Sequence, residues 1–140
     1  MDKVLNAFKT AERMEVLCEG KVIFSAERGS AEYEKFFGLW SEMTRTALRM
    51  PAFGVSIDAL TQENIKKGIW VKFYFEEVKR CDGMNFSALA VNVRPKDCGF
   101  NAERENGGKY QGRCYYIDLN GNTTEELYAA LIGIDDNRLP

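Results

Sequence analysis

The sequence predicts an α+β fold: a mostly antiparallel β-sheet built from hairpins, with helices packed on one face. Several short segments alternate apolar and polar residues and are separated by turns that contain glycine, which is typical of hairpin strands. The segment 30–49 instead places apolar residues at spacings of three and four, which is typical of an amphipathic helix. The 140 residues contain no repeat and no linker, so we expect a single domain over 1–140.

The N-terminal region predicts a short helix followed by a hairpin. Residues 2–11 place Val4, Leu5 and Phe8 on one side of a helix. Two alternating segments follow, and Glu19-Gly20 between them suits a two-residue turn. The apolar positions of this hairpin are Met14, Val16, Cys18, Val22, Phe24 and Ala26.

The segment 30–49 is the strongest helix prediction. Ser30 suits the N-cap, and Glu32 and Glu34 suit the positive N-terminal end of a helix. Pro51 is expected to end this helix. The apolar stripe, which must face a core, consists of Tyr33, Phe36, Phe37, Trp40, Met43, Ala47 and Leu48.

A short strand and a brief helix are expected between this helix and the centre of the chain. The helix is capped by Asp58 or Thr61 and ends at Gly68. The alternating residues of the strand are Phe53, Val55 and Ile57.

The stretch 69–94 carries the strongest strand signal, and its apolar pattern suggests a register. A two-residue turn at Asp82-Gly83 would set Phe73 opposite Asn92, which mixes apolar and polar faces. A three-residue loop, Cys81-Asp82-Gly83, sets Phe73 opposite Val91 and keeps one face apolar, so we adopt it. The same register pairs Phe75 with Leu89 and Val71 with Val93.

The same reasoning predicts a second hairpin, with strands 98–105 and 109–119 around the loop Asn106-Gly107-Gly108. Its predicted pairs are Phe100 with Cys114, Ala102 with Gly112, and Glu105 with Lys109. After a turn at Asn120-Gly121-Asn122, Thr123 and Glu126 have capping-box spacing for a final helix. That helix would carry Leu127 and Leu131 inward, and we expect residues 135–140 to form a polar, frayed tail.

The composition excludes several classes of protein. No residue is histidine, which removes the commonest general base and metal ligand near neutral pH. The 19 basic and 21 acidic residues give a net charge of −2, so we expect no nucleic-acid partner. No apolar run is long enough for a membrane span and no secretory signal follows Met1, so we expect no membrane contact and a cytoplasmic location.

The four cysteines lie far apart in the sequence, with no Cys-x-x-Cys pair, and are expected to be small buried or half-buried apolar residues. They are Cys18, Cys81, Cys98 and Cys114. A zinc site made of all four thiolates is the alternative, but it lacks the usual paired spacing, so we expect no metal and no other cofactor. Cys81, beside Lys79 and Arg80 in a turn, is the expected exposed thiol.

No catalytic motif is present. The segment 105–109 has two glycines but neither P-loop nor dinucleotide spacing, and no helix follows it. Glu76 and Glu77 are neighbours on a strand, so they point to opposite faces and cannot share a substrate. We therefore expect no catalytic residue and a binding or accessory protein. The alternative is an enzyme whose pocket assembles Cys, Tyr, Lys or carboxylate groups from distant segments.

The outward face of the central hairpin is the candidate binding site. In the adopted register Trp70 lies opposite Arg94, and an exposed pair of this kind is stabilised by about 0.5–1 kcal/mol. Tryptophan, tyrosine and arginine dominate binding hot spots, so this face suits a protein partner. The expected contact residues are Trp70, Lys72, Tyr74, Asn92 and Arg94.

Two alternatives stay open for this face. The N-terminal hairpin or helix could cover it, which would make Trp70 a core residue, as most tryptophans are. The aromatic and basic side chains could also stack the bases of a single-stranded nucleic acid, although the aromatic pattern of RNA-recognition strands is not reproduced.

Overall fold

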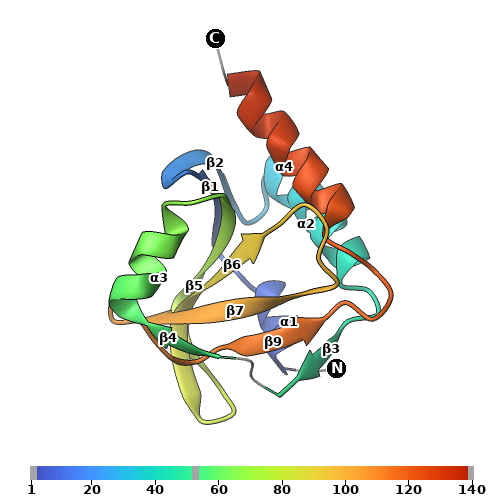
Figure 1. The fold of residues 1–140 in the computed structure, drawn as a ribbon. Coiled ribbons are helices and arrows are strands. Elements are labelled where there is room, and N and C mark those ends of the chain that lie inside the picture. Colours follow the sequence, from blue (N-terminus) through green and yellow to red (C-terminus); the bar gives the residue numbers. More distant parts are fainter. Residues whose placement is uncertain (1–2, 52–53, 139–140) are drawn as a thin grey trace.

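The computed structural model describes residues 3–51 and 54–138, and the described part excludes the side chains of 135–138. Figure 1 shows the arrangement of its elements. The helices are α1 (Lys3–Phe8), α2 (Ala31–Met43), α3 (Asp58–Ile65) and α4 (Glu125–Arg138). The strands are β1 (Arg13–Cys18), β2 (Lys21–Glu27), β3 (Leu48–Met50), β4 (Val55–Ile57), β5 (Ile69–Cys81), β6 (Met84–Val93), β7 (Gly99–Asn106), β8 (Lys109–Arg113) and β9 (Tyr115–Asp118). Of these helices, none has both the length and the apolar composition needed to cross a membrane.

The described strands form one nine-stranded sheet in the order β2-β1-β5-β6-β7-β8-β4, and β9 pairs with both β7 and β3. Every pair is antiparallel. Tight hairpins join β1 to β2, β5 to β6 and β7 to β8. The predicted α+β class with a hairpin-built antiparallel sheet is therefore confirmed.

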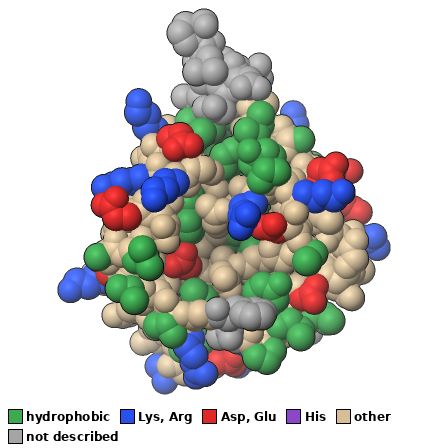
Figure 2. Space-filling model, in the orientation of Figure 1, with side chains coloured by type: hydrophobic (Ala, Val, Ile, Leu, Met, Phe, Trp, Pro, Cys, Tyr) green, Lys and Arg blue, Asp and Glu red, His purple; other side chains and the backbone are tan. Residues whose placement is uncertain are grey.

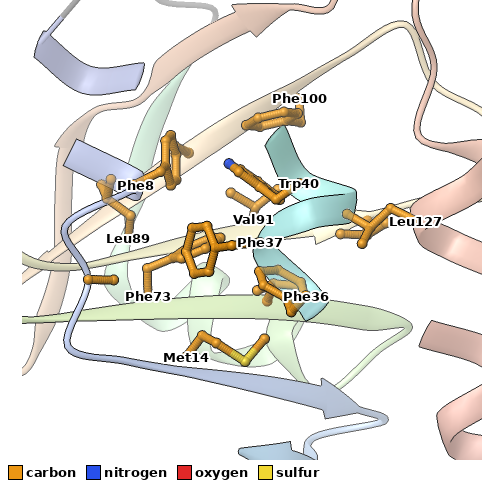
Figure 3. Close-up of a cluster of buried hydrophobic side chains, with 14 of the residues drawn as sticks. Phe8, Met14, Phe36, Phe37, Trp40, Phe73, Leu89, Val91, Phe100 and Leu127 are labelled. Carbon is orange, nitrogen blue, oxygen red and sulfur yellow. The ribbon is translucent and has the colours of Figure 1, made fainter. Parts of the chain in front are cut away.

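The main core lies on one side of the sheet, which we call the inner face. Phe73 of β5 is its centre, with its ring centroid 4.9 Å from that of Phe8 in α1 and 4.8 Å from that of Trp40 in α2 (Figure 3). Leu127 and Leu131 of α4 are buried in the same cluster, as predicted. Helices α1, α2 and α4 thus cover the inner face, where each fully buried large apolar side chain stabilises the fold by roughly 1.5–3 kcal/mol.

Helix α3 packs against the opposite side, which we call the outer face. Ile65 of α3 joins a separate apolar cluster with Trp70, Ala90, Tyr110 and Leu17. Since Trp70 follows Ile69, which belongs to the main core, the two residues point to opposite faces of β5. The expectation that the helices pack on one face of the sheet is therefore not confirmed, because α3 packs against the outer face.

The N-terminal hairpin has the predicted Glu19-Gly20 turn, and the φ angles of 51° and 82° are typical of a type I′ turn. A bulge in β2 changes the expected face, because Val16 pairs with Phe24 while Leu17 pairs with Val22. The extra residue, Ile23, is buried, whereas Val22 is exposed. The expected inward position of Val22 was therefore wrong.

Helix α2 begins as predicted, because the Ser30 hydroxyl accepts a hydrogen bond of 3.1 Å from the Tyr33 N–H. It ends at Met43, well before Pro51, so the predicted length was wrong. Leu48 lies in the short strand β3, which pairs with β9, and its side chain is exposed. Sheet pairing with a strand distant in sequence therefore overrides the helical periodicity of the last residues.

The central hairpin differs from its predicted register. The turn is the two-residue Asp82-Gly83 turn, with φ angles of 53° and 73° and with Cys81 paired to Met84. The apolar face is kept because β5 bulges: residues 75–78 stand against Ser87 alone. Phe73 consequently pairs with Leu89, a slip of two residues that leaves every side chain from Ile69 to Tyr74 on its predicted face.

The second hairpin also has a two-residue turn, Gly107-Gly108, so Asn106 pairs with Lys109. The predicted strand 109–119 is two strands, which are separated at Cys114, and Gly112 within β8 adopts the left-handed region with a φ of 76°. β8 can then pair with β4, while β9 pairs with β7 and β3. The observed pairs of β9 replace the predicted ones: Phe100 with Ile117 and Ala102 with Tyr115.

Three segments remain. The brief helix α3 has Ile57 at its N-cap with no side-chain cap and ends at Ile65, so the predicted cap at Asp58 or Thr61 and the predicted end at Gly68 were wrong. The strand expected around 53–57 is β4, although Phe53 lies outside the described residues and Val55 and Ile57 are exposed. The backbone of α4 continues to Arg138, past residue 135, where we expected the polar tail to begin.

Candidate functional site

Four of the five residues predicted to bind a partner lie at outer-face positions of β5 and β6, but Trp70 among them is not exposed. Its side chain is covered by α3, and the residue is only 4% exposed. The indole Nε1 donates hydrogen bonds to the main-chain oxygens of Asn64 at 3.1 Å and Lys67 at 3.0 Å. Of the two possibilities left open by the sequence, the structure therefore shows the buried one, and Trp70 holds the C-terminal end of α3 on the sheet.

The predicted Trp70–Arg94 pair does not form either. Because of the bulge in β5, the cross-strand partner of Trp70 is Asn92. Arg94 lies just beyond the end of β6, where it is exposed and forms an ion pair with Asp97, with Nε 3.6 Å from Oδ2. The cation–π contact expected from the sequence is thus absent, and Arg94 instead forms an ion pair with a residue three positions later in the loop after β6.

Lys72 and Tyr74 belong to a hydrogen-bonded network farther along β5. The Lys72 ammonium lies 2.9 Å from a carboxylate oxygen of Glu105 on β7. The Tyr74 hydroxyl donates to Glu15 at 2.6 Å, and the Arg13 guanidinium lies 4.2 Å from the centre of the Tyr74 ring. Burial, followed by the hydrogen bond to Glu15, raises the pKa of Tyr74 to about 12. Both side chains are held by these partners. The part of the outer face that can bind a ligand is therefore the part around Trp70 and Asn92.

That other end contains an open hollow of about 600 Å³, which we call the α3 hollow. Three of the predicted residues, Trp70, Asn92 and Arg94, line it. Its other lining residues come from α3 and the turn after it, from the loop between β6 and β7, from β7 and from β9: Asn64, Lys67, Asp97, Cys98, Gly99, Phe100, Asn101, Glu103 and Tyr116. Figure 2 shows a hollow near the centre of this face, between the regions of α3 and the loop that leads to β7.

The two walls of the α3 hollow are held by specific hydrogen bonds. On the α3 side, the Thr61 hydroxyl donates to Glu103 at 2.7 Å, and Asp58 accepts from the Tyr110 N–H at 2.9 Å. On the loop side, the buried Thr124 hydroxyl donates to the Arg94 oxygen at 2.7 Å and accepts from the Asp97 N–H at 2.9 Å. The hollow is therefore a preformed feature, with walls anchored to the sheet and to the start of α4.

A glycine shapes the end of the hollow. A Cβ atom on Gly99 would lie 2.6 Å from the Tyr116 hydroxyl oxygen and 2.6 Å from the Ile117 carbonyl oxygen. Only glycine lets the Tyr116 ring lie this close to β7. The exposed Cys98 precedes this glycine, so a thiol and a phenol lie at the same end of the hollow.

The polar groups of the α3 hollow suit recognition. Lys67 and Arg94 supply positive charge, Asp97 and Glu103 supply negative charge, and Asn92 is one of three asparagines. Glu103 is already engaged, since it accepts hydrogen bonds from the Thr61 hydroxyl at 2.7 Å and the Ser56 hydroxyl at 3.0 Å. Asparagine amides both donate and accept, which is what the main chain of a bound protein segment requires.

An exposed apolar patch lies beside the hollow on β4 and α3. We call it the β4 patch, and it consists of Val55, Ile57 and Leu60, each more than half exposed. In Figure 2 hydrophobic side chains gather over the α3 and β4 region, to the left of and below the hollow. The short alternating segment at 53–57 pointed to the strand, but its alternation would have favoured burial of Val55 and Ile57. Instead, Ser56 faces inward and contacts Glu103.

Three of the four cysteines are buried or half-buried, as expected: Cys18, Cys81 and Cys114. Cys98 is exposed instead, so the expectation that Cys81 is the exposed thiol was wrong. Cys81 lies at the end of β5, and its main-chain oxygen accepts a hydrogen bond from Tyr115. Burial raises the pKa of the Cys114 thiol. Among residues 3–51 and 54–134, no group of three or more cysteines and carboxylates is placed to hold a metal ion.

Comparisons with protein families, with curated proteins and with solved structures gave no match for this chain. The function must therefore be argued from the geometry of the outer face. The alternation in the sequence predicted the strand positions that line the α3 hollow, but it predicted neither α3 as its wall nor the β4 patch beside it. The sequence did not indicate that α3 packs on the sheet, because α3 has little amphipathic pattern.

Proposed function

We propose that the protein binds a protein partner through the outer face, with a partner segment seated in the α3 hollow and apolar partner side chains on the β4 patch. The observation that carries this proposal is the position of a preformed hollow beside a cluster of exposed aliphatic side chains. Interfaces combine apolar contact area with polar groups that fix orientation. Both components occur here on neighbouring elements.

The β4 patch favours a protein over a small molecule as the bound species. Val55, Ile57 and Leu60 protrude from an edge strand and a helix, outside the hollow, so a ligand confined to the hollow would not cover them. Exposed apolar groups that lie together commonly mark interaction sites. β4 also has an open edge, since it pairs only with β8 among the described strands, and an open edge can accept a further strand.

Photo-crosslinking from defined positions tests this proposal. A photoreactive amino acid is placed at Asn101 in the hollow, at Leu60 in the patch, and at Leu48 as an exposed control on β3. We expect one discrete protein adduct, the same from Asn101 and from Leu60, in the cells that produce the protein. Leu48 should give no such adduct.

A charge reversal supplies the second arm of the experiment. Arg94→Glu changes the rim of the hollow without touching the core, and Arg45→Glu is the control because Arg45 is also exposed and forms an i,i+3 ion pair. The adduct should be lost with Arg94→Glu and kept with Arg45→Glu. An adduct of equal yield from Leu48, or one that survives Arg94→Glu unchanged, would contradict the proposal.

A further inference from the structure

A second feature is a buried guanidinium without a carboxylate partner among the described residues. Arg104 lies on β7 and is only 6% exposed. Its Nε donates to the main-chain oxygen of Arg113 at 2.9 Å, and its Nη1 donates to the main-chain oxygen of Asn85 at 2.9 Å. Among the residues described, no carboxylate forms an ion pair with Arg104. A buried charge is costly unless an opposite charge compensates it, so this arrangement calls for an explanation.

The third nitrogen of the guanidinium, Nη2, packs closely against Gly112. A Cβ atom on residue 112 would lie 2.1 Å from Nη2, so only the glycine found there leaves room for this nitrogen, and its φ of 76° also favours glycine. Nη2 donates to none of the described residues. Because no described buried side-chain nitrogen or oxygen lacks a partner, Nη2 must reach solvent.

Arg104 lines an open hollow of about 350 Å³, which we call the Arg104 hollow. Its described lining contains no acidic residue and consists of Gly83, Met84, Asn85, Arg104, Asn106, Gln111 and Gly112. Arg80 adds positive charge nearby, since its Nη1 donates to the side-chain oxygen of Asn85 at 3.1 Å. With that oxygen occupied, the amide nitrogen of Asn85 remains as a donor.

We propose that the Arg104 hollow binds a small oxyanion, a carboxylate or a phosphate group, through Nη2 of Arg104. The anion would supply the counter-charge that the described residues do not provide. Since Nε and Nη1 already donate to main-chain oxygens, the anion contacts Nη2 with one oxygen. The amide groups of Asn85, Asn106 and Gln111 can donate to its other oxygens. This hollow shares no lining residue with the α3 hollow, but it lies next to the β4 patch, because Gln111 is the cross-strand partner of Ile57.

Amide and guanidinium NMR shifts test the proposal. The intact protein is titrated separately with sodium phosphate and with sodium acetate, and sodium chloride keeps the ionic strength constant. We expect saturable shifts for the Arg104 Nε–H and for the backbone amides of Gly112 and Asn85. Saturation by phosphate alone, by acetate alone or by both supports an oxyanion site and identifies the group that it prefers. Shifts that never saturate, or that chloride reproduces, overturn it.

Two variants test whether the NMR shifts arise from anion binding in the Arg104 hollow. Gln111→Glu places a carboxylate at the exposed rim of the hollow without removing Arg104, and it should weaken anion binding by about tenfold or more. Gln62→Glu makes the same change on an exposed residue of α3 and should leave anion binding unchanged. Equal weakening by both variants would show a general effect of net charge and would overturn the proposal. Because Gln111→Glu keeps every buried group, it avoids the folding defect that removal of Arg104 risks.

Discussion

Lys72 and Glu105 form an ion pair of 2.9 Å over the outer face of β6, although they belong to two strands that do not touch. Ala88 and Ala90 of β6 lie between them, and their small side chains leave the space in which the two long side chains meet. The side chains of the pair are only 14% and 17% exposed. Lys72, expected from the sequence to contact a partner, is therefore part of the packed outer face.

Removal of one member of this pair should destabilise the fold. Lys72→Met leaves the Glu105 carboxylate in a largely buried position without its cation, and we expect a loss of about 2 kcal/mol in the free energy of unfolding. The double variant Lys72→Met, Glu105→Leu should lose less than the sum of the single losses, because no buried charge is left unpaired. Urea unfolding measures all three variants.

The matched control for this pair is Lys66→Met. Lys66 pairs with Glu63 at 3.1 Å, but both side chains are about two thirds exposed, at 64% and 65%. Its loss should change the free energy of unfolding by less than about 0.5 kcal/mol. Equal losses for Lys72→Met and Lys66→Met would contradict the view that burial decides the effect.

Alkaline pH should destabilise the protein through Tyr74. Its pKa is raised from 10.0 to about 12 in the folded state, so the folded protein retains the phenol proton more strongly than the unfolded chain does. The contribution of this group is therefore complete below about pH 10 and is lost as the pH rises from about 10 to about 12. Urea unfolding at several pH values across this window should show a smaller loss for Tyr74→Phe than for the wild type. Two parallel pH profiles would mean that Tyr74 does not carry this dependence.

Fluorescence quenching can test whether Trp70 is buried. The chain has two tryptophans, so Trp40→Phe leaves Trp70 as the single reporter. Because α3 covers the Trp70 ring, acrylamide should quench its emission several-fold less in the folded variant than in urea. Trp70→Phe provides the corresponding measurement for Trp40. Equal quenching of Trp70 in the folded and unfolded chains would instead restore an exposed indole.

Thiol modification should identify Cys98 as the reactive cysteine of the folded protein. Cys98 is exposed, Cys18 is partly exposed, and Cys81 and Cys114 are buried. A thiol reagent should therefore give a fast phase of one thiol per chain, and Cys98→Ser should remove that phase. If Cys81→Ser removed it instead, the arrangement at the end of β5 would be wrong. Because Cys98 lines the α3 hollow, a probe attached there can also report a bound partner.

Features that depend on a few neighbouring residues were predictable from the sequence. The Ser30 cap, the Glu19-Gly20 turn and the alternation of Ile69–Tyr74 all follow from local backbone geometry. Local geometry also explains why Trp70 and Asn92 line the α3 hollow, since alternation places both on the outer face.

Registers were less predictable, because a bulge shifts the pairing of two strands without changing the alternation of either strand. The sequence favoured a three-residue loop in the central hairpin because a continuous register had to keep Phe73 on the apolar face. The chain instead combines a two-residue turn with a bulge at 75–78, and both solutions satisfy the same alternation. Only the packing of the whole sheet decides between the three-residue loop and the two-residue turn with a bulge.

The class of fold, the presence of the hairpins and the faces of the side chains from Ile69 to Tyr74 follow from the sequence alone, because they depend on steric preferences and on period-two alternation. Only the tertiary structure decided what covers each face. Trp70 is buried because α3 packs over β5, and Arg104 is buried with its Nη2 packed against Gly112 of β8. These contacts join segments that lie far apart in the sequence, so the local pattern of one segment does not reveal the position of the other.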